Sequence, residues 1–307
     1  MEKGFLESDL VREDTFTTQS VIHAYMEPRA ALAGWDLSGK LTLYTSTQTP
    51  YYVQQHLGLT LGMNPDDIRV IKPFVGGGFG GKSDGMSAVE FCAALLSKHA
   101  GRPVKLVCSR DEEFAAARRK HPTEITMKTG VKKDGTIIAR QCRAILDGGA
   151  YCSLGPLTTV LVGTFQTLPF LFKNFKYDGY RIYTNKPPCG AMRGHGCPHP
   201  RFAFEGVLDM LAEDLGMDPI ELRLKNAMEP DSRTVNELDV GSCELEACLE
   251  AVKERSGWSE KKGRLPPGKG IGIGCGGFVS GAGYPIYRSK FPHSSAIVRV
   301  SEDGEAA

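Results

Sequence analysis

The sequence predicts a mixed α/β fold, and three observations support this class. Apolar and polar residues alternate in 41–47 and in the two segments that flank Asp134-Gly135, which is typical of strands. Apolar residues recur at helical spacing in 86–100 and again after residue 201. Hairpins stand between the helices, so the order of elements differs from the repeated βα units of a doubly wound sheet.

The first half of the chain is expected to alternate strands with helices. An extended segment, 14–27, enters the motif HAYMEP (23–28), and 29–46 forms a hairpin. Thr49-Pro50 is a typical helix start, and Gly62 a typical end. A strand (66–75), a helix (86–100), a strand (103–109) and a hairpin (125–146) follow, and the apolar positions 86, 89, 92, 93 and 96 predict the buried face of that helix.

The second half is expected to begin irregularly and then become helical. Residues 148–200 are rich in Gly, Pro and aromatic residues, and ordered loops of this kind often carry function. Helices are predicted over 202–216, after the cap Asp218-Pro219, and over 243–257. The strand expected over 294–300 and its turn at Asp303-Gly304 have no partner strand in the sequence. We therefore expect a cut chain, or a sheet that another polypeptide completes.

The composition excludes several classes of protein. The 307 residues include 37 Lys+Arg and 36 Asp+Glu, so bulk charge does not favour nucleic acid or an anionic membrane. No apolar run could span a bilayer and no secretory signal is visible, which predicts a cytoplasmic protein. No C-x-x-C pair occurs among the nine Cys, and we expect reduced, mostly buried thiols. Metal binding by Cys189, His195, Cys197 and His199 is a less favoured alternative.

The glycine-rich segment 76–83 (GGGFGGKS) matches two nucleotide-binding patterns. It fits the phosphate loop G-x-x-x-x-G-K-[ST], in which Lys82 would bind phosphate and Ser83 would bind magnesium. It also contains the dinucleotide pattern G-x-G-x-x-G. Neither a suitably placed Walker B aspartate nor an acidic ribose ligand follows, so a purely structural glycine turn is equally compatible with the pattern.

A third interpretation comes from resemblance. HAYMEP, STQTP (46–50), GGGFGGK (76–82) and AMRGHG (191–196) occur in this order, and D-P-x-E-x-R-x-K-N follows at 218–226. Together they resemble the molybdopterin-binding chain of the xanthine dehydrogenase/aldehyde oxidase family, from about residue 14 to the end. Within that family, PPCGAMRGHG is most similar to the large subunit of the 4-hydroxybenzoyl-CoA reductase branch.

The resemblance implies a cofactor site in which a pterin holds molybdenum and no side chain binds the metal directly. Gln48 would donate to the apical oxo group, backbone N–H groups of the glycine loop would point to the same region, and Arg193 would lie near the anionic pterin. The implied cofactor-binding residues are Gln48, Gly78, Phe79, Gly80, Arg193 and Gly194. The motif residues His23 and Glu27 would have a structural role near the cofactor.

Two positions depart from the xanthine-oxidising members. Ser83 stands where those members have a glutamate that binds purine, which argues against xanthine as substrate. His195 replaces a phenylalanine and could contact substrate or act as an acid or base, although a histidine oriented only by backbone is equally compatible. The carbon monoxide dehydrogenase branch is disfavoured because AMRGHG lacks its cysteine-containing loop.

The resemblance also implies what lies on other polypeptides. Residues 1–262 would form the first molybdopterin-binding domain, 263–268 a linker, and 269–307 the incomplete start of the second. The catalytic Glu is not in this chain. A C-terminal molybdopterin half, a [2Fe–2S] subunit and an FAD subunit would be partners, and the pterin would carry a cytosine dinucleotide.

The function implied is that of a molybdenum hydroxylase-type oxidoreductase. It would act on an aromatic or heteroaromatic small molecule, extending to an aromatic acyl-CoA, with water as oxygen source or product. Two alternatives stay open. One is a phosphate-loop NTPase that uses 76–83, and the other is a non-catalytic scaffold subunit of a molybdoenzyme complex.

Overall fold

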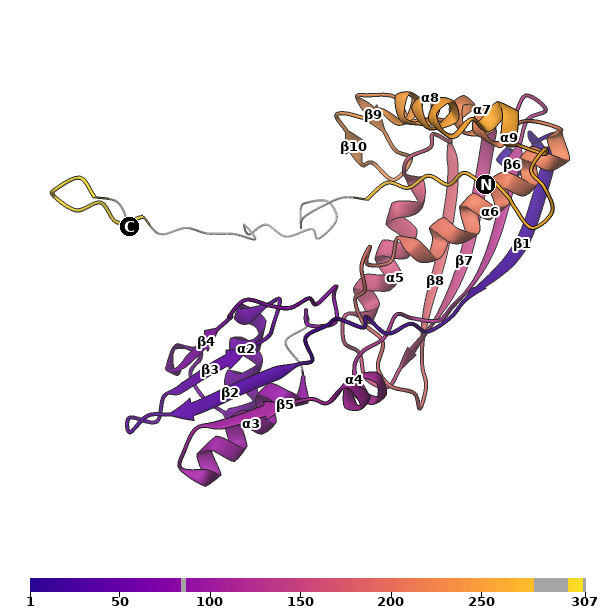
Figure 1. Ribbon diagram of the computed structural model, residues 1–307. Coiled ribbons are helices and arrows are strands. Elements are labelled where there is room, and N and C mark those ends of the chain that lie inside the picture. The colour runs from indigo at the N-terminus through magenta and orange to yellow at the C-terminus, as the bar shows by residue number, and fades with distance from the viewer. Residues whose placement is uncertain (84–86, 279–297, 306–307) are drawn as a thin grey trace.

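The computed structural model describes residues 1–83, 87–278 and 298–305. Two separate four-stranded sheets divide the chain into a small lobe and a large lobe (Figure 1). Each sheet contains one parallel pair of strands and otherwise antiparallel pairs. The predicted mixed α/β class is therefore confirmed.

The small lobe is a sheet in the order β4-β3-β2-β5 with two helices packed on it. The predicted hairpin is present, and the helix after it starts at Pro50 and ends where Gly62 adopts φ 64°. The strand expected over 66–75 is shorter than predicted because Pro65–Asp67 forms a 3-10 turn (η1). The elements are β2 (Ala30–Trp35), β3 (Leu41–Thr45), α2 (Pro50–Leu61), β4 (Ile68–Ile71), α3 (Ala88–Ala100) and β5 (Val104–Val107).

The buried face of α3 differs from the apolar face that the sequence predicts. Cys92 and Leu96 are exposed, whereas Glu90 and Ser97 are buried beside small alanines. The carboxylate of Glu90 accepts a hydrogen bond from the Thr45 hydroxyl at 2.9 Å, which satisfies its charge inside the lobe. Small residues let α3 lie close to the sheet, and this close approach outweighs the burial of the larger apolar side chains.

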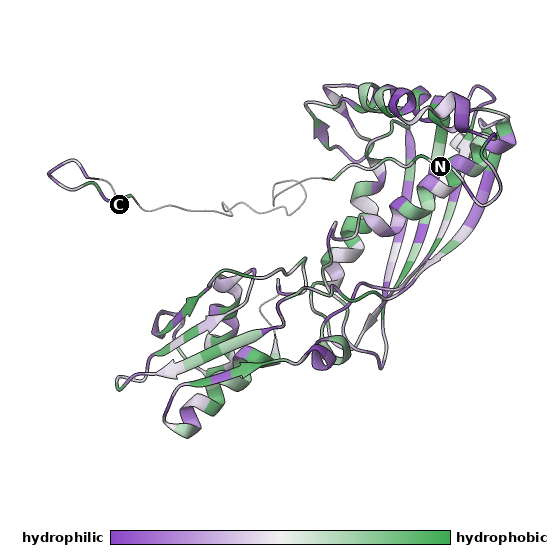
Figure 2. Cartoon of the chain, in the orientation of Figure 1, coloured by the Kyte–Doolittle hydropathy of each residue, from purple (hydrophilic) through white to green (hydrophobic). Residues whose placement is uncertain are grey.

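The large lobe has strand order β1-β6-β7-β8, with α5 and α6 packed on the sheet. The predicted hairpin turn at Asp134-Gly135 joins β6 to β7, and Gly135 has φ 86°. Hydrophobic residues run along the strands of both sheets (Figure 2). The elements are β1 (Leu10–Thr18), β6 (Thr123–Val131), β7 (Ile137–Gly149), α5 (Gly155–Thr164), β8 (Asn174–Tyr183) and α6 (Pro198–Leu215).

The prediction that 148–200 is irregular is wrong, because this segment contains α5 and β8. α5 begins at Gly155-Pro156 without a side-chain cap, so the usual start signal is weak. β8 is an edge strand with mostly half-exposed residues, so it lacks the alternation that reveals a strand. α6 also starts earlier than expected, at Pro198, since proline is well suited to a first helical turn.

Short helices and a small hairpin lie at one end of the large lobe (Figure 1). The Asp218 cap is confirmed, because its carboxylate accepts from the Ile220 N–H at 2.7 Å. Part of the strand expected over 294–300 lies outside the described residues, but Gly304 does form a turn, donating to Ser301 O at 2.9 Å. The remaining elements are α1 (Glu2–Leu6), α4 (Arg110–Ala116), η2 (Phe165–Thr167), α7 (Pro219–Lys225), β9 (Ser232–Arg233), β10 (Asp239–Val240), α8 (Leu245–Ser256) and α9 (Trp258–Lys261).

Candidate cofactor site

Two segments that are far apart in the sequence meet between the lobes. They are the glycine loop (76–83) and the arginine turn (191–196). The Arg193 N–H donates to Phe79 O at 2.9 Å, and the Arg193 guanidinium carbon lies 5.1 Å from the centre of the Phe79 ring. This cation–π contact leaves both side chains exposed. The fold therefore places the two motifs side by side.

The glycines of this loop are required by close packing. A Cβ on Gly78 would lie 2.4 Å from Gln48 Oε1, and a Cβ on Gly80 would lie 2.7 Å from the Ala191 carbonyl oxygen. Gly80 also has φ 97°, which disfavours any side chain. The neighbouring Phe79 is held at φ 50°, a conformation that non-glycine residues rarely adopt. Such strain is typical of a functional loop.

The orientation of the Gln48 amide follows from its neighbours. Its Oε1 accepts from the Gly80 N–H at 3.0 Å and from the Lys82 N–H at 3.4 Å, so the oxygen must face the loop. The Nε2 group makes no hydrogen bond to any residue in the described part of the chain, and the side chain is exposed. Gln48 can therefore donate to an oxygen outside the protein.

One expectation for the glycine loop needs correction. The resemblance implies that the Gly80 N–H points to the cofactor, but in this structure Gln48 accepts that hydrogen bond. The reason is geometric, because the loop folds around the Gln48 side chain rather than beside it. The exposed donor at this position is consequently the Gln48 amide nitrogen.

The two ends of the glycine loop are fixed by one buried ion pair. Lys82 Nζ lies 2.8 Å from both the backbone oxygen and Oε2 of Glu27, and the same Oε2 accepts from the Gly76 N–H at 2.9 Å. Burial opposes ionisation of Glu27, but the hydrogen bonds from Lys82 and Gly76 outweigh it and lower its pKa. Since the Lys82 ammonium is used inside the protein, it is not available to phosphate, which argues against the phosphate-loop alternative.

The HAYMEP motif supports both segments from behind. His23 Nε2 donates to the Ala191 carbonyl at 2.8 Å, which anchors the start of the arginine turn. The Tyr25 hydroxyl donates to Glu113 Oε2 at 2.5 Å, and Arg29 pairs with the same carboxylate at 3.1 Å. Burial, followed by the bond to Glu113, raises the pKa of Tyr25. The structural role expected for His23 and Glu27 is thus consistent with their contacts.

The two residues expected near substrate make inward contacts. The Ser83 hydroxyl donates to Gly80 O at 2.6 Å and therefore closes the loop. His195 has φ 20°, and its Nε2 lies 2.9 Å from the Thr158 hydroxyl oxygen on α5. Burial lowers the pKa of His195. Sequence reasoning missed Thr158, because it lies in the segment that was expected to be irregular.

The cluster Cys189, His195, Cys197 and His199 does not form a metal site. Among the described residues, no group of three or more His, Cys, Asp or Glu side chains could hold a metal ion. His199 Nε2 contacts His121 O at 3.1 Å, and burial raises the pKa of the Cys189 thiol to about 11. All nine cysteines are free, as the reduced-thiol interpretation predicts.

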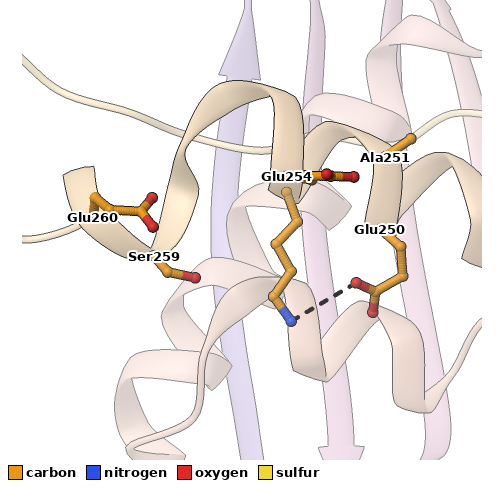
Figure 3. Close-up of a pocket in the computed structure, with 6 residues that line it drawn as sticks. Glu250, Ala251, Glu254, Ser259 and Glu260 are labelled. Atoms are coloured by element: carbon orange, nitrogen blue, oxygen red, sulfur yellow. Dashed lines mark ion pairs between the residues drawn. The ribbon is translucent and has the colours of Figure 1, made fainter.

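Two pockets lie apart from the predicted cofactor residues. Figure 3 shows a shallow surface pocket of about 580 Å³ on α8 and α9, lined by Glu250, Glu254 and Glu260, where Lys253 pairs with Glu250 at 4.0 Å. A second pocket of about 390 Å³ adjoins the start of α3 and includes Arg29 in its lining. None of the predicted cofactor-binding residues lines either pocket.

Comparison with known proteins supports the same site. The family described as "Molybdopterin cofactor-binding domain" matches residues 1–227. The chain belongs to this family. Within it, the chain is 36% identical over 267 residues to the nicotinate dehydrogenase large molybdopterin subunit of Eubacterium barkeri, covering 85% of this chain and 62% of the relative. It is 35% identical over 275 residues to the putative xanthine dehydrogenase molybdenum-binding subunit of Escherichia coli K12, covering 86% and 36%.

Solved structures give the same result for the fold of this molybdopterin cofactor-binding domain. Quinoline 2-oxidoreductase from Pseudomonas putida 86 is similar with TM-score 0.79 and 29% identity, covering 84% of this chain and 34% of that chain. Aldehyde oxidoreductase from Desulfovibrio gigas is similar with TM-score 0.79 and 27% identity, covering 85% and 29%. This chain therefore spans only part of the length of its relatives. No helix among the described residues is long and apolar enough to cross a membrane.

Proposed function

We propose that this domain holds the molybdenum cofactor of a hydroxylase-type oxidoreductase between the glycine loop and the arginine turn. The observation that carries the proposal is the Gln48 amide, whose oxygen is fixed by the loop and whose exposed nitrogen is left to donate. Arg193 adds an exposed cation beside Phe79. A donor and a cation on a rigid loop fit an anionic, oxygen-bearing group.

When bound, the cofactor would supply two-electron redox chemistry at molybdenum, with water as oxygen source or product. This chain's own residues would bind and orient it. Gln48 donates one hydrogen bond, Gly78 and Gly80 allow the close approach, and Arg193 balances negative charge. The catalytic Glu would come from outside this sequence, since the resemblance places it there.

The proposed substrate is a small aromatic or heteroaromatic molecule. Two proteins similar to this chain are named for nicotinate and quinoline, which are nitrogen-containing aromatic rings. The Ser83 hydroxyl is bonded to Gly80 O, so this position offers no carboxylate of the kind that binds purine. The narrower assignment, reductive chemistry on an aromatic acyl-CoA, rests on the segment PPCGAMRGHG alone.

We further propose that the pterin carries a cytosine dinucleotide and that the complete enzyme includes further parts. These would be a C-terminal molybdopterin half, an iron–sulfur subunit and a flavin subunit. The names of similar proteins, which describe large or molybdenum-binding subunits, support an enzyme of several chains. A scaffold role without cofactor would leave the exposed Gln48 and Arg193 groups unexplained.

The test is metal and pterin analysis of the chain purified with its co-purifying subunits. We expect molybdenum and pterin in the wild-type complex and a clear loss of both in Gln48→Ala. Gln55→Ala, on the outer side of α2, is the matched control and should retain the wild-type content. Molybdenum absent from the wild-type complex would overturn the proposed function. Equal content in both variants would refute only the role of Gln48.

A further inference from the structure

The hydrogen bonds of His195 define which ring nitrogen carries its proton. His195 Nε2 lies 2.9 Å from Thr158 Oγ1, and the Thr158 hydroxyl donates its single hydrogen to Leu154 O at 3.0 Å. The hydroxyl can therefore only accept from the imidazole. A neutral His195 consequently carries its proton on Nε2, and its Nδ1 has a free lone pair.

The surroundings hold this arrangement in place. Thr158 is only 1% exposed, so water does not compete for its hydroxyl. On the other side, the backbone of Gly196 lies against α5, where a Cβ would approach the Thr158 carbonyl oxygen at 3.0 Å. The His195 N–H closes a turn by donating to Met192 O at 2.6 Å. The imidazole is thus fixed between α5 and the arginine turn.

The other ring nitrogen is left without an internal partner. His195 Nδ1 makes no hydrogen bond to any residue that the structure describes, and the side chain is only half-buried. Burial lowers the pKa of His195, which favours the neutral imidazole at neutral pH. His195 lies two residues beyond Arg193, the residue in contact with Phe79 of the glycine loop. An acceptor is therefore available beside the proposed cofactor site.

We propose that Thr158 is a positioning residue that fixes the Nε2–H tautomer of His195, so that His195 Nδ1 accepts a hydrogen bond from the substrate. The site then selects aromatic rings that present an N–H or O–H donor. This inference rests on the proposed function, because it assumes that the substrate lies beside the arginine turn. It assigns substrate recognition, not proton transfer, to His195.

The experiment compares binding of 2-pyridone, which has a ring N–H, with N-methyl-2-pyridone, which does not. Isothermal titration of the complete purified enzyme gives a ratio of affinities without turnover. In the wild type we expect 2-pyridone to bind about tenfold more tightly, the size of one hydrogen bond. In Thr158→Val the tautomer is no longer fixed, and the ratio should fall to near one.

Thr159→Val is the matched control on the same helix. The Thr159 hydroxyl donates to Gly155 O at 3.0 Å, the same bond to the preceding turn that Thr158 makes, but it does not contact His195. Its affinity ratio should equal that of the wild type. Thr158→Ser keeps the hydroxyl and should also retain the ratio, which covers the case in which Thr158→Val does not fold.

Several outcomes would overturn the inference. They are no preference in the wild type, an unchanged ratio in Thr158→Val, an equal loss in Thr159→Val, or a lost ratio in Thr158→Ser. His195→Asn keeps an acceptor near the Nδ1 position, whereas His195→Gln places its amide near Nε2, so only the former should retain part of the preference. Molybdenum analysis of the same samples separates failure of this inference from failure of the proposed function.

Discussion

Replacement of Lys82 by methionine tests what fixes the glycine loop. The Lys82 side chain is 1% exposed and that of Glu27 is 33% exposed, and Lys82 Nζ bonds two oxygens of Glu27. Breaking a buried pair costs about 3–5 kcal/mol, and the partial exposure of Glu27 reduces this to about 2–3 kcal/mol in Lys82→Met. The loop should also loosen, because Glu27 holds Gly76 at its other end.

Urea unfolding and molybdenum content together measure this prediction. Lys82→Met should lower the free energy of unfolding by the stated amount and reduce the cofactor content, whereas Lys72→Met, at an exposed position of the same segment, should change neither. In the double variant with Glu27→Gln, the losses should be smaller than the sum of the two single losses, since each removes the same contact. Additive losses, or a stable Lys82→Met with normal cofactor content, would refute the clamp.

Lys82→Met also distinguishes the phosphate-loop alternative. If Lys82 bound nucleotide phosphates, the variant would lose ATP affinity while its stability changed little. We expect instead that calorimetry finds no ATP binding even in the wild type, because the ammonium faces Glu27 and lies 4.6 Å from the centre of the Tyr25 ring. ATP binding that depends on Lys82 would contradict this view of the loop.

Two further predictions concern packing and pH. Gly80→Ala should abolish cofactor binding, because its Cβ would meet the Ala191 backbone at 2.7 Å, whereas Gly34→Ala, with its nearest neighbour at 3.8 Å, should leave metal content unchanged. Burial lowers the pKa of His121 to about 3 from its ordinary 6.5, so the unfolded chain binds a proton that the folded chain does not as pH falls below 6.5. The free energy of unfolding should thus fall by about 2 kcal/mol for this residue between pH 7.5 and 5, and His121→Gln should lose that dependence, unlike exposed His99→Gln, in urea titrations. An identical pH profile in both variants would contradict this.

Much of the local structure could be predicted because its causes are local. The helix at Pro50 starts with proline and ends with a left-handed glycine, and the Asp218 cap bonds its own first turn. The turn at Asp134-Gly135 likewise requires only that glycine reach a positive φ. In each case the residues that determine the conformation lie within one turn of one another.

The failed predictions share a different cause. α5 and β8 are specified mainly by what they pack against, so their sequences carry weak start and alternation signals. On α3, hydrophobicity alone favours Leu96 as a buried residue, but the structure buries Glu90 through its bond to Thr45. The partner of each residue lies on another element, which a pattern within one segment cannot reveal.

The sequence by itself determined the mixed fold, the ordered motifs and the residues of the candidate site. The tertiary structure alone decided how those residues are used. It turned the Gln48 oxygen into the loop, committed Lys82 to Glu27, and placed His195 against Thr158. The physical reason is that a polar side chain acts through the partners that it meets in space, and these partners lie on segments distant in the chain.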